Sequence, residues 1–197
     1  MTEEHDLIDR LATGDKEAFR ELVEAYKKKI YYLAFDLVGN QSDAEDVSQD
    51  VFLKAYRAFG TFKRDARLGA WLYRITYNTA IDHLRRRGIS AGTVDEAVLE
   101  ANLDRVAREA PARDTDPART AESELLQLRI ASALEKVSPQ EKTVFLLRHY
   151  DDLMLKDIAD VLGLSLGSVK SYLFRAVKKL QRELGAGGPA RWEVSHD

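Results

Sequence analysis

Residues 165–184, SLGSVKSYLFRAVKKLQREL, contain the pattern that decides the fold. Apolar side chains recur there at spacings of four and three, which places one apolar stripe along one face of a helix. The stripe consists of Val169, Leu173, Val177, Leu180 and Leu184. The opposite face carries cationic and hydroxyl side chains around a flat ring, types that reach phosphates and base edges in a major groove. These side chains are Ser168, Lys170, Ser171, Phe174, Arg175, Lys178 and Arg182.

A shorter amphipathic helix is predicted just upstream. Its apolar side chains are Leu155, Ile158, Ala159 and Leu162. Gly163 then supplies a residue that can turn the chain, and Ser165 is placed to cap the next helix. A short helix, a turn with glycine and a longer basic helix are typical of the helix-turn-helix, whose second helix reads DNA. The alternative is an ordinary helical hairpin with a solvated basic face.

Composition narrows the class of protein. The 197 residues suffice for one domain or two small ones, and 45% hydrophobic residues suffice for packed cores. Four prolines and no long alternation of apolar and polar residues favour an all-α fold. Cysteine is absent, which excludes disulfides, cysteine-ligated zinc and thiol catalysis. No run approaches the roughly 18 apolar residues of a membrane span, and the acidic N-terminus lacks the plan of a signal peptide, so we expect a cytoplasmic protein.

Charge is distributed unevenly along the chain, although the formal net charge is only −3. Residues 1–94 hold 15 basic and 15 acidic side chains, whereas residues 95–118 hold three basic against seven acidic ones. Residues 119–184 hold 11 basic against nine acidic side chains, and the cations are concentrated in the last helix. Because local patches set a field that is screened over about 10 Å, the acidic total is compatible with DNA binding.

Helical periodicity also runs through the first half of the chain. Between residues 6 and 38 the apolar pattern predicts two helices with a break at Gly14. Residues 42–59, SDAEDVSQDVFLKAYRAF, predict a further helix, in which Ser42 and Glu45 form a capping box.

A strip of acidic and polar side chains is predicted on the outward face of that helix. It consists of Asp43, Asp46, Gln49 and Asp50. Compensation of the helix dipole explains acidic residues in the first turn, but Gln49 and Asp50 lie beyond it. A docking surface for a basic partner helix is the other interpretation. A metal site is disfavoured, because the helix contains no histidine and carboxylates on one helix rarely close a coordination sphere.

Aromatic and cationic side chains are interleaved in the next segment, a loop over residues 60–69 followed by a predicted helix over residues 70–88. The aromatics Trp71, Tyr73 and Tyr77 alternate with arginines in this helix. This combination suits single-stranded nucleic acid, because bases stack on rings while cations follow the phosphates. The alternative is that the rings belong to the core and that the arginines complement the negative end of the helix dipole.

Periodicity is lost after this helix and returns later in the chain. The prolines and the acidic excess predict a flexible linker, which either tethers two domains or occupies a cationic channel of a partner. In the second domain, Ser138, Pro139 and Glu141 form a strong helix-start signal with a capping box. The predicted segments are an N-terminal domain over 6–90, the linker over 91–119, a C-terminal domain over 120–184 and a flexible tail over 185–197.

Together these segments resemble a bacterial sigma factor of the extracytoplasmic-function (ECF) group. The matching segments are GDKEAFRELVEAY at 14–26, DAEDVSQDVFLKAY at 43–56, WLYRITYNTAIDHLRRR at 71–87 and DIADVLGLSLGSVKSYLFRAVKKL at 157–180. The last segment alone is weakly specific, because many regulators share the helix-turn-helix. All four in this order, separated by an acidic linker, are highly specific. The resemblance implies a protein without enzymatic activity that binds RNA polymerase core and directs promoter-specific initiation.

The resemblance also implies a role for each candidate surface. The strip Asp43, Asp46, Gln49 and Asp50 would dock on the clamp helices of the polymerase β′ subunit. The side chains implied to melt and read the −10 element are Phe62, Lys63, Arg64, Arg74, Tyr77, Asn78, Arg85 and Arg86. Those implied to read the −35 element as duplex are Ser165, Ser168, Lys170, Ser171, Phe174, Arg175 and Lys178. The predicted helix from Pro139 to Tyr150 would help to seat the second domain on polymerase and DNA.

The implied partners are RNA polymerase core, through its β′ clamp helices and β flap, and promoter DNA. An anti-sigma factor, often membrane-bound, is a further implied partner and would hold this protein at the inner face of the membrane. An enzyme is disfavoured, because His5, His83, His149 and His196 have no acidic or hydroxyl partner at a recognisable spacing and the sequence contains no phosphate-binding glycine loop and no metal cluster. No cofactor or metal is expected. A stand-alone helix-turn-helix regulator and a protein that mimics a sigma factor without starting transcription are the alternatives.

Overall fold

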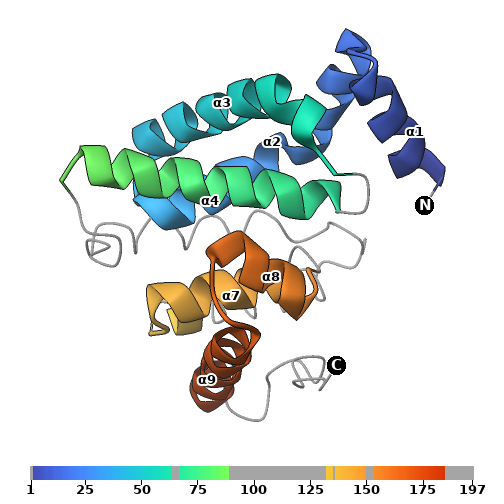
Figure 1. Cartoon of the computed structure of the whole chain (residues 1–197). Coiled ribbons are helices and arrows are strands. Elements are labelled where there is room, and N and C mark those ends of the chain that lie inside the picture. Colours follow the sequence, from blue (N-terminus) through green and yellow to red (C-terminus); the bar gives the residue numbers. More distant parts are fainter. Residues whose placement is uncertain (1, 64–66, 89–131, 135, 150–152, 185–197) are drawn as a thin grey trace, which may run out of the picture. The chain divides into compact units, whose positions relative to one another are not determined.

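The structure, a computed structural model, shows a helical protein in two compact units (Figure 1). It describes residues 2–63, 67–88, 132–134, 136–149 and 153–184. Within these ranges every regular element is a helix, which confirms the all-α prediction. The first unit is formed mainly by Met1–Thr93, and the second by Val94–Ala159 with Leu164–Asp197. The predicted linker over 91–119 and the predicted tail over 185–197 lie outside the described residues.

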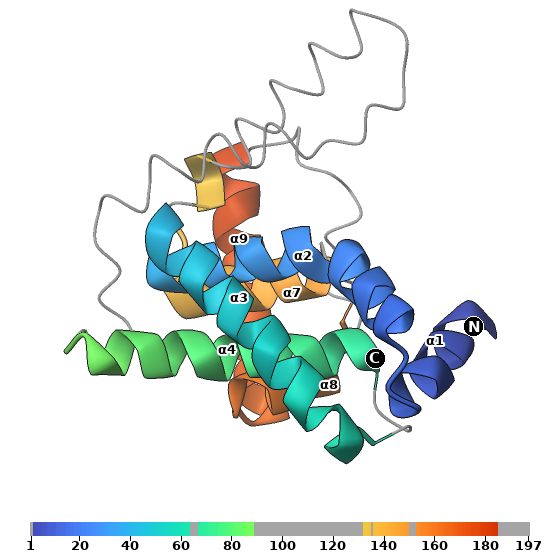
Figure 2. The same ribbon diagram turned by 90° about the horizontal axis from the view of Figure 1, so that it is seen from above.

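Three long helices, α2, α3 and α4, pack against one another and form the first unit (Figures 1 and 2). The elements of this unit are α1 (Thr2–Ala12), α2 (Lys16–Val38), α3 (Gln41–Ala58), the 3-10 turn η1 (Phe59–Thr61) and α4 (Leu68–Arg86). The fully buried side chains that hold the three long helices together include Leu22, Ile30, Val47, Val51 and Leu72. Burying an aliphatic side chain of this size contributes about 1.5–3 kcal/mol, so this core fixes the faces that α3 and α4 expose.

The start of α3 differs from the predicted capping box, which is therefore wrong. Asn40, not Ser42, is the N-cap: its Oδ1 accepts a hydrogen bond from the Asp43 N–H at 2.9 Å. Asn40 has the extended backbone that an N-cap requires, with φ −146° and ψ 155°, whereas Ser42 already lies within the helix. Glu45 instead accepts a hydrogen bond from the Gln41 side chain at 2.8 Å.

The second unit contains α7 (Pro139–His149), the first five residues of α8 (Leu155–Leu162) and α9 (Leu166–Leu184). Helix α9 packs against α7. The apolar stripe predicted for α9 is buried along its whole length, as are the apolar side chains predicted for α8. No helix in the described part of the chain is long and apolar enough to cross a bilayer.

The turn between α8 and α9 has the predicted helix-turn-helix chemistry. Gly163 has a positive φ of 64°, a conformation that favours glycine. The following residue, Leu164, donates its N–H to the Ala159 carbonyl at 2.9 Å. Ser165 then caps α9, because its Oγ accepts a hydrogen bond from the Ser168 N–H at 3.1 Å.

Two glycine substitutions in this motif should change stability in opposite directions. Gly163→Ala is expected to lower the free energy of unfolding by about 1–2 kcal/mol, because an L side chain is strained at positive φ. Gly167→Ala is expected to raise it by up to about 1 kcal/mol, because Gly167 lies within α9 and the new Cβ would meet only the Ser165 Oγ, at 3.9 Å. Urea unfolding of both variants measures the difference. A neutral or stabilising Gly163→Ala contradicts the assigned turn.

Candidate protein and nucleic-acid interfaces

One face of α3 presents a continuous exposed row. Asp46, Gln49 and Asp50 are exposed, opposite the buried Val47 and Val51. Two large apolar side chains, Leu53 and Tyr56, extend this row and are 54% and 52% exposed. They follow Gln49 at helical spacings of four and three. The sequence reasoning missed them, since apolar residues in an amphipathic helix are normally assigned to the core.

Asp43 does not belong to this exposed row, which corrects the prediction that it shares the outward face. Its side chain is only 13% exposed, and its Oδ1 lies 3.1 Å from the His83 Nε2. Asp43 also forms an ion pair with Arg87. Both partners lie at the C-terminal end of α4, so we infer that Asp43 joins the start of α3 to the end of α4. The remaining exposed row, Asp46, Gln49, Asp50, Leu53 and Tyr56, is called the α3 strip below.

Burial by itself raises the pKa of the Asp43 carboxyl, but the hydrogen bond from Asn40 and the nearby His83 and Arg87 side chains outweigh it and hold the pKa below its usual value. A lowered pKa means that Asp43 stabilises the folded state above the unfolded-state pKa, about 3.9, and that this contribution is lost as the pH falls through the folded-state pKa. The ionised form of Asp43 is therefore part of the packing of α3 on α4.

Asp43→Asn is expected to lower the free energy of unfolding by about 1 kcal/mol at pH 7, a modest amount because Arg87 is half exposed. The difference from the unsubstituted protein should shrink as the pH drops below about 4. Urea unfolding across this pH range measures it. Asp46→Asn is the matched control, since Asp46 is exposed. Equal changes in the free energy of unfolding for the two variants at pH 7 would contradict the structural role of Asp43.

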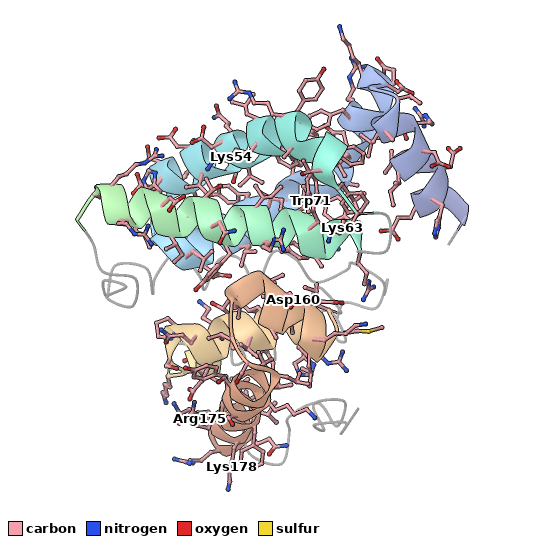
Figure 3. The ribbon with its side chains drawn as sticks, in the orientation of Figure 1. Lys54, Lys63, Trp71, Asp160, Arg175 and Lys178 are labelled. Atoms are coloured by element: carbon pink, nitrogen blue, oxygen red, sulfur yellow. The ribbon has the colours of Figure 1, made fainter. Side chains whose placement is uncertain are left out.

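An aromatic cluster lies where the loop after η1 meets the N-terminal end of α4. The Phe62 ring stacks on Phe59 at 5.4 Å between centroids and meets the edge of Trp71 at 5.3 Å. Phe62 and Trp71 remain partly exposed, while Phe59 is buried. Lys63 is exposed beside this cluster (Figure 3), whereas Arg64 lies outside the described residues. The cluster thus combines a fixed, partly exposed aromatic surface with a cation.

Along α4, the predicted polar side chains continue from this cluster. Arg74, Asn78 and Arg85 are exposed at helical spacings of four and seven, and they share one face of the helix. Arg86 is also exposed. Tyr77 is half buried, and burial raises the pKa of its hydroxyl, which therefore stays protonated at neutral pH. Trp71 and Tyr77 are thus neither wholly in the core nor wholly exposed.

The outward face of α9 brings together most of the side chains predicted for it. Lys170, Ser171, Phe174, Arg175 and Lys178 are exposed. Arg175 and Lys178 extend from α9 on this face (Figure 3). The ammonium group of Lys178 lies 5.3 Å from the centroid of the Phe174 ring, within cation–π range.

The hydroxyl side chains of α9 are largely engaged within the helix. Ser168 is half buried, and its Oγ lies 2.9 Å from that of Ser165. Ser171 donates its hydroxyl to the Gly167 carbonyl at 2.9 Å. These hydroxyls therefore stabilise the N-terminal turns of α9, and the exposed cations and Phe174 make up most of the remaining exposed side chains on this face.

A buried carboxylate underlies this face and was predicted only as a helix cap. Glu141 is 4% exposed. Its Oε2 accepts the Ser138 N–H at 3.3 Å, which is one of the two hydrogen bonds of the predicted capping box. Its Oε1 lies 3.0 Å from Arg175 Nε, and its Oε2 lies 2.7 Å from Lys179 Nζ. Burial by itself raises the pKa of Glu141, but hydrogen bonds from Lys179 and the Ser138 N–H hold that pKa below its usual value.

Both units match families of known proteins. Residues 22–89 match the family described as Sigma-70 region 2, and residues 127–180 match the family described as Sigma-70, region 4. The RNA polymerase sigma-H factor of Pseudomonas aeruginosa is 33% identical over 189 residues, covering 93% of this chain and 96% of that protein. The ECF sigma factor SigW of Bacillus subtilis is 30% identical over 177 residues, covering 90% of this chain and 94% of that protein. The chain belongs to the ECF sigma factors.

Solved structures agree with this assignment. CnrH, solved in complex with the cytosolic domain of CnrY, is 27% identical to this sigma factor, with a TM-score of 0.59. That comparison covers 92% of this chain and 97% of CnrH. The sigma factor RpoE of Bartonella quintana, solved with the anti-sigma factor NepR, is 21% identical with a TM-score of 0.60, which shows a shared fold.

Family membership confirms the expected general function. This protein is a sigma factor that binds RNA polymerase and directs promoter-specific initiation of transcription. Because RNA polymerase and the bacterial chromosome share the cytoplasm, the expected cytoplasmic location follows from the family. The region 2 match over the first unit argues against a stand-alone helix-turn-helix regulator.

Proposed function

We propose that this sigma factor divides its work among three surfaces of the two units. The α3 strip docks on the β′ clamp helices of RNA polymerase, the aromatic cluster and polar face of α4 open and read the −10 element, and α9 reads the −35 element. The observation that carries the proposal is the exposed face of α9, where three cations and a phenyl ring stand over a fully packed apolar stripe. The exposed face of such a helix can enter the major groove, while its apolar face stays packed against the rest of the unit.

Docking by the α3 strip is supported by its mixed chemistry. Asp46 and Asp50 offer charge to a basic partner helix, and the exposed Leu53 and Tyr56 offer apolar area beside it. Exposed apolar side chains rimmed by polar ones are typical of protein interfaces. The charges would speed association with the partner and align the two surfaces. Tyr56 and Leu53 would provide the apolar area that is buried in the complex.

Opening of the −10 element is supported by the aromatic cluster at the start of α4. Melting costs roughly 1.4 kcal/mol per base step, and stacking one unpaired base on an aromatic side chain returns about 1–3 kcal/mol. Phe62 and Trp71 are held in place by Phe59, so they offer a preformed stacking surface. The exposed cations Lys63, Arg74, Arg85 and Arg86 are available for the phosphates of the displaced strand.

An anti-sigma factor is the partner that we propose for the inactive state. The support comes from two solved proteins that share this fold: CnrH was solved with the cytosolic domain of CnrY, and the sigma factor RpoE of Bartonella quintana was solved with the anti-sigma factor NepR. We also propose that this sigma factor performs no catalysis itself, because its family acts by binding and positioning. Among the residues that the structure describes, no group of three or more His, Cys, Asp or Glu side chains could hold a metal ion.

Arg175→Ala tests the proposed role of α9. It is expected to reduce discrimination at one position of the −35 element by about 10- to 100-fold, since a good arginine–guanine pair contributes about 1–3 kcal/mol. Affinity for RNA polymerase core should stay unchanged. Competition binding with holoenzyme on promoter fragments measures both quantities.

Arg182→Ala is the matched control, because it removes the same charge from the exposed last turn of α9. This control is expected to weaken binding to all sequences alike. An Arg175→Ala variant that loses core affinity and DNA discrimination together would contradict the assignment.

A further inference from the structure

Arg175 is held from two directions before any DNA is bound. Its Nε lies 3.0 Å from the buried Oε1 of Glu141, in an ion pair across the packing of α9 on α7. Its guanidinium carbon lies 4.9 Å from the centroid of the Tyr172 ring, one turn earlier on α9. The Arg175 side chain is nevertheless 53% exposed. The Nε atom and the guanidinium plane of Arg175 are therefore held in place, while the side chain remains half exposed.

The contacts of Arg175 leave its recognition chemistry free. A guanidinium has five N–H donors, and Nε is the Arg175 nitrogen that lies 3.0 Å from Glu141 Oε1. No hydrogen bond joins either terminal amino group of Arg175 to another described residue, and Nε is the nitrogen paired with Glu141. Two terminal amino groups side by side match the O6 and N7 acceptors of guanine in the major groove. The pair with Glu141 thus orients Arg175 without consuming the donors that read a base.

Lys179 completes the electrostatics of the cluster. It lies 2.7 Å from the second carboxylate oxygen of Glu141, so the buried acid faces two cations. Arg175 therefore keeps a net positive neighbourhood that attracts DNA, although its guanidinium is already paired. A buried carboxylate with a single cation would have cancelled that charge.

We propose that Glu141 and Tyr172 are positioning residues for base-specific readout by Arg175. The proposal deepens the function proposed above for α9 and rests on it. An arginine that is free in solution loses rotamer freedom when it binds, whereas an arginine that is already oriented loses little. The loss avoided per immobilised side chain corresponds to about three- to tenfold in affinity. Only the correct base accepts hydrogen bonds from both terminal amino groups. The affinity gained by orienting Arg175 beforehand therefore increases the preference for that base over the other three.

A purely structural role of Glu141 makes a different prediction. If its carboxylate only joins α7 to α9, its loss should lower thermal stability and weaken binding to every DNA sequence alike. If it orients Arg175, its loss should flatten the preference at the single position that Arg175 reads. Substitution of Tyr172 provides a second test of the positioning role. The Tyr172 ring contributes no charge to the packing of α7 on α9, so its loss should affect only the orientation of Arg175.

The experiment uses holoenzyme, formed from RNA polymerase core and the full chain, to select DNA from a library randomised across the −35 element. Arg175→Ala first identifies the position whose base preference it abolishes. Glu141→Gln and Tyr172→Leu are each expected to reduce the preference at that same position about three- to tenfold. Preferences at the other positions should stay unchanged. Neither substitution should reduce the preference further in the Arg175→Ala background, as a double-mutant cycle requires.

Two matched variants serve as controls. Tyr172→Phe retains the ring and is expected to retain the preference. Glu183→Gln removes the ion pair between Lys136 and Glu183, which also reaches α9 but lies apart from Arg175, and it should leave the preference unchanged. Thermal unfolding of every variant separates loss of fold from loss of readout. If Glu141→Gln does not fold, the comparison of Tyr172→Leu with Tyr172→Phe decides the question.

Unchanged preference in both Glu141→Gln and Tyr172→Leu, or equal weakening on all sequences, would overturn the positioning role. This result is distinguishable from failure of the function proposed for α9. In that second case Arg175→Ala itself would leave all preferences in the −35 element intact.

Discussion

Reversing two charges on the α3 strip, with Asp46→Lys and Asp50→Lys together, is expected to weaken binding to RNA polymerase core by about 100-fold or more. Close charge pairs at protein interfaces contribute about 1.5–7 kcal/mol, and reversal replaces attraction by repulsion. Both carboxylates are exposed, so the fold should be retained. Fluorescence-detected titration of core with the labelled sigma factor measures the affinity.

The matched control reverses two exposed acidic side chains elsewhere in the first unit, with Glu4→Lys and Glu24→Lys. It changes the net charge by the same amount but leaves the α3 strip intact. Core affinity within a few fold of the unsubstituted protein is expected for this control. Equal losses in the two double variants would mean that overall charge, and not the α3 strip, determines docking.

The second large effect concerns DNA binding without polymerase. The free sigma factor is expected to bind a promoter fragment at least about 1000-fold more weakly than the holoenzyme does at roughly 0.15 M salt. Two small reading surfaces gain about 10²–10⁴ in avidity when a rigid partner holds both at the correct separation. The free chain consists of two compact units, and it lacks that partner.

Fluorescence anisotropy at several salt concentrations measures this difference. Binding by the free chain should also fall steeply with salt and discriminate poorly, because phosphate contacts dominate non-specific affinity. A scrambled fragment of the same length is the control. Tight and sequence-specific binding by the free chain at physiological salt would contradict the division of labour between the two units.

Local signals in the sequence predicted the parts of the fold that depend on neighbouring residues. The apolar stripe of α9, the turn at Gly163 and the Ser165 cap all lie within one short segment, and the structure contains each of them. The resemblance to sigma factors assigned the two proposed reading surfaces to the segments that form α4 and α9. At the start of α3, two capping residues compete within three positions, and the local pattern selected Ser42 where the structure uses Asn40.

Long-range partners explain most of what the sequence could not reveal. Asp43 looks like an exposed acid until α4 brings His83 and Arg87 against it. Glu141 fits a capping box, but its two cationic partners come from α9 and are visible only after α7 and α9 pack. Leu53 and Tyr56 resemble core residues by type, and only the folded first unit shows them exposed.

Run-off transcription with purified RNA polymerase core, with and without this protein, tests the sigma-factor function most directly. Promoter-containing genomic fragments serve as templates, and the mapped start sites give both promoter elements. Discrete transcripts that appear only when the protein is present are the expected result. Core that binds the protein but yields no transcript, or core that fails to bind it, would contradict this function.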